Sequence, residues 1–176
     1  CRKLIFATFP HPRRLRILAL PLLVYQKSGL RTLVRKMGIP QLLPKRLAAM
    51  EALLPDVPVR SAKLPAVTSP NAKARRRVGM FSGCVQQVFF SHVNAATARV
   101  LTAEGCEVVI PQEQECCGAL MVHSGLEAEA AELAKRMIVT FEKADVDAIV
   151  INSAGCGSTM KDPACRKRIA SGCSTN

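Results

Sequence analysis

The sequence predicts an α/β fold: a small three-layer domain with a short parallel sheet flanked by helices, preceded by a basic segment that is helical or irregular. The first observation behind this prediction is an uneven distribution of charge. Residues 1–77 contain 17 lysines and arginines but only two acidic residues, whereas residues 78–176 contain 8 basic and 11 acidic residues. The second observation is that short apolar runs alternate with amphipathic stretches after residue 77, as strands and helices do in a parallel sheet.

Composition divides the 176 residues into four parts. They are a basic helical connector (1–54), a proline-rich linker (55–77), a domain that holds the clustered cysteines (78–162) and an irregular tail (163–176). The chain begins with cysteine instead of methionine, which indicates a fragment or a processed product. Its eight cysteines are clustered rather than spread, which is typical of reduced thiols and metal ligands and not of a disulfide framework.

The connector is rich in leucine and interrupted by prolines. Its apolar stretch Leu15–Tyr25 is interrupted by Pro21 and has roughly half the length that spans a bilayer. We expect the connector helices to pack against another domain or subunit, with docking to a membrane surface or a partner as the alternative. Prolines should end these helices, which are expected at 12–25, 27–37 and 44–54.

The linker 55–77 contains four prolines and ends in the basic run Arg75-Arg76-Arg77. Proline and small polar residues make a compact fold improbable there. No aromatic residues are interleaved with the basic run, and no recognised nucleic-acid-binding fold accompanies it. The sequence therefore argues against nucleic acid as a partner.

The domain at 78–162 is expected to alternate strand, helix, strand, helix, strand. The predicted strands are 78–82, 106–110 and 147–152, and the predicted helices are 87–104 and 125–144. The apolar stripe of the first helix is expected at Phe89, Val93, Ala96 and Val100, and that of the second at Leu126, Ala130, Leu133, Met137 and Phe141. Such an order implies right-handed crossovers and a parallel sheet covered by helices.

The most informative motif is Cys116-Cys117-Gly118, with Cys84 before it and Cys156 after it. Two adjacent thiols rarely pair with each other, because a vicinal disulfide departs from the usual bridge geometry. Each cysteine position follows the carboxyl end of an expected strand, and such ends gather at one edge of a parallel sheet. Four thiolates from three loops suit tetrahedral zinc or an iron–sulfur cluster. Buried free cysteines in a core are the alternative.

The remaining candidate ligands are weaker. Cys106 is expected within a strand as a small buried residue, and His123 and His92 are expected to be surface or structural residues. Four other residues are expected to be incidental or solvated: Cys165, Cys173, Glu113 and Glu115. No Ser-His-Asp order, Walker loop or GxGxxG fingerprint supports hydrolase, nucleotidase or dinucleotide chemistry.

At these residues the chain resembles the CCG (cysteine-rich) domain family, which includes heterodisulfide reductase subunits, the iron–sulfur subunit of anaerobic glycerol-3-phosphate dehydrogenase and lactate-utilisation proteins. It looks most like the iron–sulfur subunits of glycolate oxidase (glycolate dehydrogenase). The matching segments are RRRVGMFSGCVQQVFF, NAATARVL, ECCGAL and INSAGCGSTMKD. In such subunits two ferredoxin-type clusters precede a basic connector and two CCG repeats. This chain is similar to the connector and the first repeat, and the likeness ends after Asp162.

The resemblance implies a metal centre held by Cys84, Cys116, Cys117 and Cys156, which act as ligands and not as catalytic acids or bases. The fuller family pattern ends in CxxC, and Ser153 stands at the first of those positions here. Five-cysteine members are similar to proteins with non-cubane clusters. Four cysteines make a single [4Fe–4S] cluster, or a zinc ion as the alternative, the more natural expectation.

The function that the resemblance implies is electron transfer within a flavin-dependent 2-hydroxy-acid (glycolate) oxidase complex. This chain would pass electrons from the flavin-containing subunits toward quinone, as a subunit of the oxidoreductase and not its catalytic flavin subunit. It would be cytoplasmic, at the inner face of the cell membrane if a membrane surface or quinone-linked acceptor is a partner. The alternatives are a zinc-stabilised structural or interaction module and a thiol–disulfide redox subunit like the heterodisulfide reductases.

Overall fold

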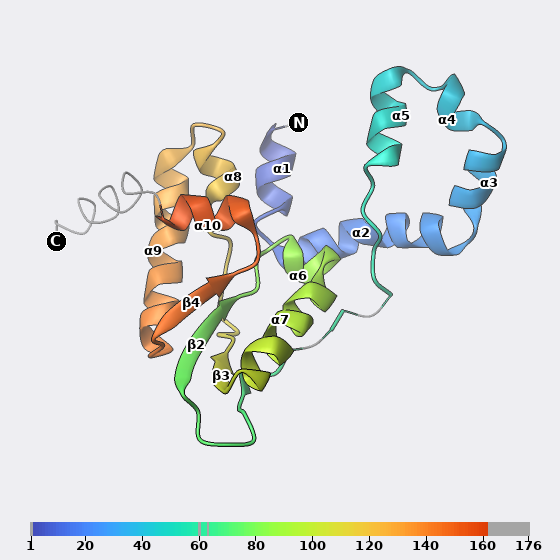
Figure 1. Ribbon diagram of the computed structural model, residues 1–176. Coiled ribbons are helices and arrows are strands. Elements are labelled where there is room, and N and C mark those ends of the chain that lie inside the picture. Colours follow the sequence, from blue (N-terminus) through green and yellow to red (C-terminus); the bar gives the residue numbers. More distant parts are fainter. Residues whose placement is uncertain (1, 60, 63, 162–176) are drawn as a thin grey trace.

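The computed structural model describes residues 2–59, 61–62 and 64–161 and has the expected mixed α/β fold. A four-stranded sheet in the order β1-β3-β2-β4 lies among the helices (Figure 1). β2 pairs in parallel with β3 and with β4, whereas β1 pairs antiparallel with β3 at the edge. The strands are β1 (Val67–Thr68), β2 (Arg76–Phe81), β3 (Cys106–Val109) and β4 (Ala148–Ile151). The three parallel strands therefore end at the same edge of the sheet, as predicted.

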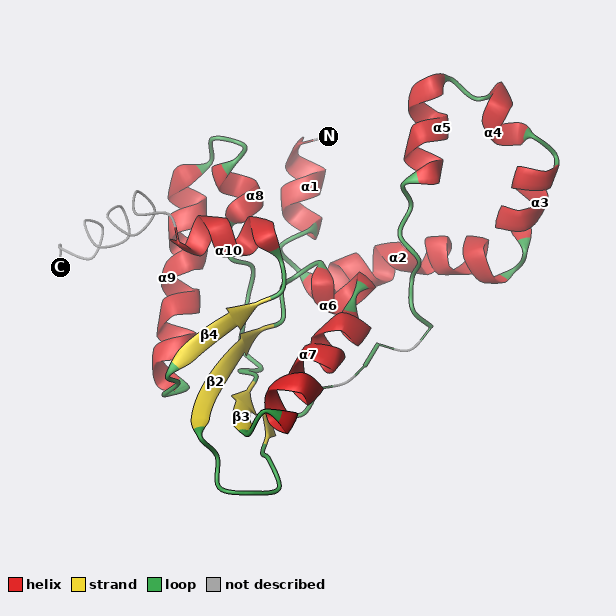
Figure 2. Ribbon diagram, in the orientation of Figure 1, coloured by secondary structure: helices red, strands yellow, loops and turns green. Residues whose placement is uncertain are grey.

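The central strand β2 divides the core into two halves. Successive strand residues point to opposite faces of a sheet, so Met80 and Phe81 pack on different sides. Met80 packs with Ala98 of α7 (Ser91–Ala103) on one face. Phe81 packs with Met137 and Phe141 of α9 (Glu127–Lys143) on the other face. Figure 2 shows these two helices on either side of the strands, which gives the three layers expected from the sequence.

The first helix of the domain differs from the prediction. It is divided into α6 (Gln86–Phe89) and α7, and the expected apolar stripe is wrong, because Val93 and Val100 are 37% and 61% exposed. The buried side of α7 instead carries Ser91, Asn94 and Ala98. A polar residue can occupy this inner face because buried polar groups are tolerated when they are hydrogen-bonded, and Asn94 is bonded at the strand ends.

The second helix agrees with the prediction. Ala130, Met137 and Phe141 are buried along α9, and Glu127 and Glu129 lie in its first turn, where acidic side chains complement the helix dipole. Two short helices adjoin the cysteine loops, and neither was expected: α8 (Ala119–Val122) and α10 (Ala154–Lys161).

The connector forms helices α1 (Arg2–Thr8), α2 (Pro12–Lys27), α3 (Leu30–Lys36), α4 (Ile39–Leu42) and α5 (Lys45–Ala52). The helix expected at 12–25 is confirmed: α2 extends to Lys27 and continues through Pro21. A proline inside a helix removes one hydrogen bond. Here Leu15 and Ala19 on one side of Pro21 and Leu22 on the other belong to a single apolar cluster, and this packing holds the helix together.

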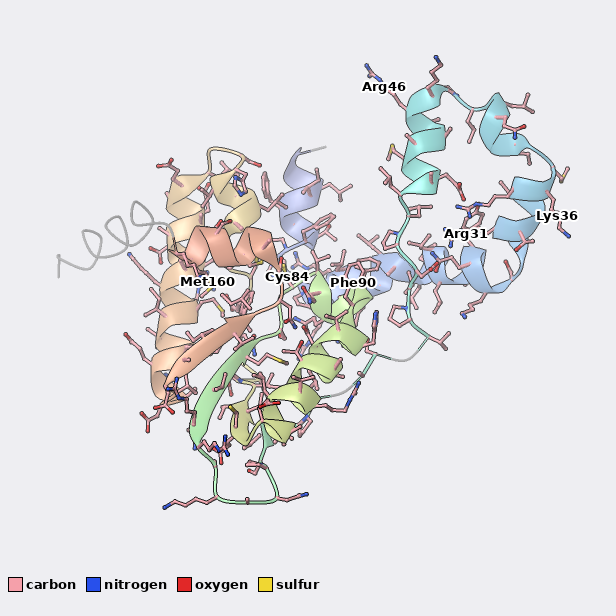
Figure 3. All side chains as sticks on the ribbon, in the orientation of Figure 1. Arg31, Lys36, Arg46, Cys84, Phe90 and Met160 are labelled. Carbon is pink, nitrogen blue, oxygen red and sulfur yellow. The ribbon has the colours of Figure 1, made fainter. Side chains whose placement is uncertain are left out.

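α2 also packs onto the cysteine-containing domain. Its buried residues Leu15 and Ala19 meet Val85, Val88 and Phe89, which directly follow Cys84 in the chain. The rest of the connector is tied by polar contacts, as Figure 3 shows around Arg31. Arg31 pairs with Asp56 at 2.7 Å and Arg35 with Glu51 at 3.1 Å.

The linker is more ordered than the sequence predicts. It supplies β1, and the N–H of Ile110 donates to the carbonyl of Ala66 at 2.7 Å. This pairing covers the outer edge of β3, a contact that depends on residues far away in sequence. Within the described part of the chain, no helix is both long and apolar enough to span a membrane.

Candidate metal centre

Cys84 lies in the loop between β2 and α6, at the carboxyl edge of the sheet. The preceding Gly83 has φ +68°, a left-handed backbone conformation that glycine adopts without steric cost. Cys84 is buried, and it is followed by the residues on which α2 packs. Figure 3 labels Cys84 at this end of the sheet.

The Cys116-Cys117-Gly118 motif lies between β3 and α8, and both thiols are buried. Gly118 has φ +77°, and a Cβ atom placed there would lie 2.9 Å from the carbonyl oxygen of Ala130 and 3.0 Å from its Cα. Contacts this short with backbone atoms cannot be relieved by rotating a side chain. The third residue of the motif is therefore glycine for two reasons: the backbone conformation and the close approach of α9.

Cys156 lies in the first turns of α10, which follows β4. It is only partly buried, unlike the other three. The side chain of Ser153, which precedes α10, is hydrogen-bonded to the Cys156 thiol. Serine at the position where the fuller motif has cysteine thus contacts a sulfur of the site.

The structure brings the four predicted cysteines together in a row. The Cys84 thiol donates to the Cys116 sulfur at an Sγ–Sγ distance of 3.5 Å. The Cys117 thiol is hydrogen-bonded to both Cys116 and Cys156. The four are free cysteines from three loops. Among residues 2–59, 61–62 and 64–161, no group of three or more His, Cys, Asp or Glu side chains has the geometry of a metal site, so ligation would require the sulfurs to turn toward a common point.

The hydrogen bonds divide the row into thiolates and thiols. Bonds from Cys117 and then Cys84 lower the pKa of Cys116 to about 3, aided by the N–H of Gly118 at 3.5 Å. A bond from Cys117 lowers the pKa of Cys156 to about 7. The pKa values of Cys84 and Cys117 are raised, chiefly because each thiol donates to Cys116. Burial is the second cause for Cys84, and the hydrogen bond to Cys156 is the second cause for Cys117. Four such neighbours cannot all ionise without a cation to neutralise them.

Amide side chains that the sequence analysis missed hold the three loops together. Asn94 is 1% exposed and donates to the carbonyl of Ser82 at 2.8 Å, and it accepts from Asn152 at 2.9 Å. These bonds join the ends of β2 and β4. Gln114, just before the cysteine pair, accepts from the N–H of Ser82 at 2.8 Å and donates to the carbonyl of Met80 at 3.1 Å. The polar residue within the apolar pattern of α7 was the signal that could have revealed this network.

His11, just before α2, is a second feature that the sequence analysis missed. Its charge lies close enough to Cys116 to contribute to the low pKa of that thiol. No local pattern indicates this, because the two residues are more than a hundred positions apart.

The weaker candidates lie elsewhere or outside the described residues. Cys106 lies in β3 and is partly buried, which corrects the expectation of full burial. His123 is exposed, as expected, and His92, which was expected to be a structural residue, is also exposed. Glu113 is exposed, whereas Glu115 pairs with Arg136 at 3.1 Å instead of being only solvated. Cys1, Cys165 and Cys173, like the tail 163–176, lie outside the residues that the structure describes.

Two known families match the chain. The linker region of the glycolate oxidase iron–sulfur subunit matches residues 1–54, and the cysteine-rich domain matches residues 78–161. No solved structure matches significantly.

Curated relatives cover the same parts. The chain is 44% identical over 160 residues to the probable glycolate oxidase iron–sulfur subunit of Bacillus subtilis (strain 168), which is 88% of this chain and 35% of that protein. It is 33% identical over 144 residues to the glycolate oxidase iron–sulfur subunit of Escherichia coli (strain K12), 77% of this chain and 35% of that protein. A lactate utilization protein A from Exiguobacterium sp. (strain ATCC BAA-1283 / AT1b) is 42% identical over 85 residues, covering 48% of this chain and 35% of that protein. The chain thus spans about a third of the length of these relatives.

Proposed function

Since the chain belongs to the cysteine-rich (CCG) domain family and carries the linker region of glycolate oxidase iron–sulfur subunits, we propose that it is part of an iron–sulfur electron-transfer subunit of a 2-hydroxy-acid oxidase. The observation that carries this proposal is the convergence of four cysteines from three loops at one edge of the sheet. Cysteine thiolates are the donors that a soft metal centre takes.

The donor set fits an iron–sulfur cluster. Cysteine thiolates are the usual ligands of such clusters, and the row contains four sulfurs. Cys84, Cys116, Cys117 and Cys156 would hold a [4Fe–4S] cluster, which when bound supplies reversible one-electron transfer. The N–H of Gly118, bonded to the Cys116 sulfur, is the kind of donor that tunes the reduction potential of such a centre. Burial of three of the ligands would keep water away from it.

The partners follow from the same family. A flavin-containing subunit would oxidise the 2-hydroxy acid, with glycolate as the proposed substrate, and this chain would carry electrons onward to a quinone-linked acceptor. We also propose that the protein is located in the cytoplasm, at the inner face of the membrane. Three relatives support a hydroxy-acid oxidase or utilisation system through their names.

Iron content tests the proposal. Protein purified without oxygen should contain about four irons per chain, with the broad visible absorbance of an iron–sulfur cluster. Cys117→Ser should lose most of the iron, because it removes the sulfur that joins Cys116 to Cys156. Cys106→Ser is the matched control, since Cys106 lies in β3 outside the row, and it should retain the iron. A folded, iron-free protein whose stability the Cys117→Ser change leaves unaltered would refute the proposal.

A zinc-stabilised module is the second candidate, and one distance favours it. Zinc–sulfur bonds of about 2.3 Å in a tetrahedron place neighbouring sulfurs roughly 3.8 Å apart. The Cys84 and Cys116 sulfurs are 3.5 Å apart, so this pair could bind one zinc ion with little movement, whereas a cluster of four irons needs more room. Elemental analysis with a visible spectrum separates the candidates, because zinc is colourless and redox-inactive.

A further inference from the structure

A wide cleft separates the beginning of α2 from the cysteine-containing domain. Its cavity volume is about 1230 Å³. One wall is formed by His11, Arg13, Arg14 and Arg16, and the opposite wall by the segment 110–115 that leads to Cys116. The cleft therefore opens beside the candidate metal centre and is lined by the connector and the domain together.

The wall formed by α2 keeps its positive charge. None of its three arginines has an ion-pair partner among the residues that the structure describes. The two acidic residues of the first 77 positions, Glu51 and Asp56, are engaged by Arg31 and Arg35 at the far end of the connector.

The opposite wall does not cancel this charge. It contains two carboxylates, Glu113 and Glu115, and Glu115 is paired with Arg136. Three arginines thus face one carboxylate without an ion-pair partner among the described residues. The excess is positive and is exposed to solvent.

This charge lies close to the sulfurs. Glu115 directly precedes Cys116, and Ser82, two residues before Cys84, also lines the cleft. His11, on the basic wall, lines the same cleft. The electrostatic field of a charged cleft can accelerate the approach of oppositely charged molecules by about 10- to 1000-fold, and salt weakens this effect.

We propose that this basic cleft is the face through which the metal centre exchanges electrons with a redox partner protein, and that the partner presents an acidic surface to it. The inference rests on the proposed iron–sulfur function. In each encounter one electron passes between the partner and the cluster, so that one is oxidised and the other reduced, and no bond is made or broken. The uncharged or acidic faces of the domain would not steer such a partner.

Two small oxidants of opposite charge test the inference. Cluster-loaded protein is reduced with dithionite, freed of excess reductant and mixed by stopped flow with hexacyanoferrate(III) or hexaammineruthenium(III). Each oxidant accepts one electron from the reduced cluster. At low ionic strength, Arg13→Gln/Arg16→Gln should slow the anionic oxidant by about three- to tenfold without slowing the cationic one, and salt should remove the difference. Arg14 is left in place because it donates to the carbonyl of Ala7.

The matched control removes the same charge elsewhere. Lys36 and Arg46 are exposed on α3 and α5, which Figure 3 shows far from Cys84. Lys36→Gln/Arg46→Gln should change neither rate more than about twofold, because the field of a charge weakens with distance and these charges lie far from the centre. Short poly-glutamate should slow hexacyanoferrate(III) with the wild type and not with Arg13→Gln/Arg16→Gln.

The outcomes separate this inference from the function on which it rests. Equal hexacyanoferrate(III) rates for wild type and Arg13→Gln/Arg16→Gln, with a reducible cluster in both, would overturn the inference and leave the proposed function intact. Equal slowing by the two double variants would also overturn it, because the effect would then be one of net charge. A protein that takes up no reducible cluster would overturn both.

Discussion

At the scale of single residues, Gly118 explains the form of the cysteine motif. A left-handed backbone at φ +77° and a distance of 2.9 Å from a prospective Cβ to the Ala130 carbonyl leave no room for a side chain. Its N–H also donates to the Cys116 sulfur. One residue therefore turns the chain, lets α9 approach and contacts the site.

Gly118→Ala should lower the free energy of unfolding by more than about 1–2 kcal/mol, since alanine in the left-handed region alone costs that much. Chemical denaturation followed by circular dichroism measures the change. Gly155→Ala is the control: Gly155 lies in helix α10 with nothing within 4 Å of its prospective Cβ. Because alanine favours helices over glycine, the control should be neutral or stabilising by about 0.5–1 kcal/mol. A Gly118→Ala variant as stable as the control would contradict the packing argument.

At the scale of elements, α2 connects the basic connector to the domain. Its inner side packs against the residues that follow Cys84, whereas its other side remains exposed. Packing of this kind stabilises the Cys84 loop from outside the sheet. The connector is thus a structural support for the site as well as a carrier of charge.

Leu15→Ala and Leu20→Ala make the same change on the two sides of α2. Leu15 is 5% exposed and Leu20 is 55% exposed. We expect a loss of about 2–5 kcal/mol for Leu15→Ala, because a buried leucine leaves a cavity. Leu20→Ala should stay within about 0.5 kcal/mol. Thermal or urea unfolding measures both, and equal losses would show that α2 does not pack on the domain as described.

At the scale of the whole molecule, three loops bring together four cysteines whose protonation states depend on one another. The row of sulfurs alternates thiol and thiolate, with Cys116 and Cys156 as acceptors and Cys84 and Cys117 as donors. Metal ligands must be deprotonated, so binding displaces the remaining protons. The number displaced depends on pH through Cys156, whose pKa of about 7 lies within the accessible range.

Zinc binding to metal-free protein should release about two protons per metal near pH 8 and about three near pH 5. Below pH 7 Cys156 is protonated before binding, whereas Cys116, with a pKa of about 3, is not. Zinc affinity should therefore fall as the pH decreases, and more steeply below pH 7 than above it. Calorimetry in buffers of different ionisation enthalpy counts the protons, and Cys156→Ser should abolish the change between the two pH values. A release that does not vary with pH would contradict this description of the row.

Much of the fold follows from local patterns. The strands after residue 77, the buried stripe of α9 and the parallel sheet were predicted, because period and apolar content report burial directly. The prediction placed the wrong face of α7 against the sheet. Asn94 lies on the buried face, where its hydrogen bonds to Ser82 and Asn152 make a polar residue possible. The strand β1 was missed for a similar reason, because it depends on pairing with β3, which is distant in sequence. The four-part division of the chain stays a prediction.

From the sequence alone, the four cysteines can be placed after three strands and at one edge of the sheet, because parallel strands bring their carboxyl ends together. The sequence could not determine which sulfur donates to which, why the motif ends in glycine, or that His11 and the arginines of α2 lie across a cleft from Cys116. Those facts arise from contacts between residues far apart in the chain. Local periodicity carries no record of such contacts, so they become visible only in the folded chain.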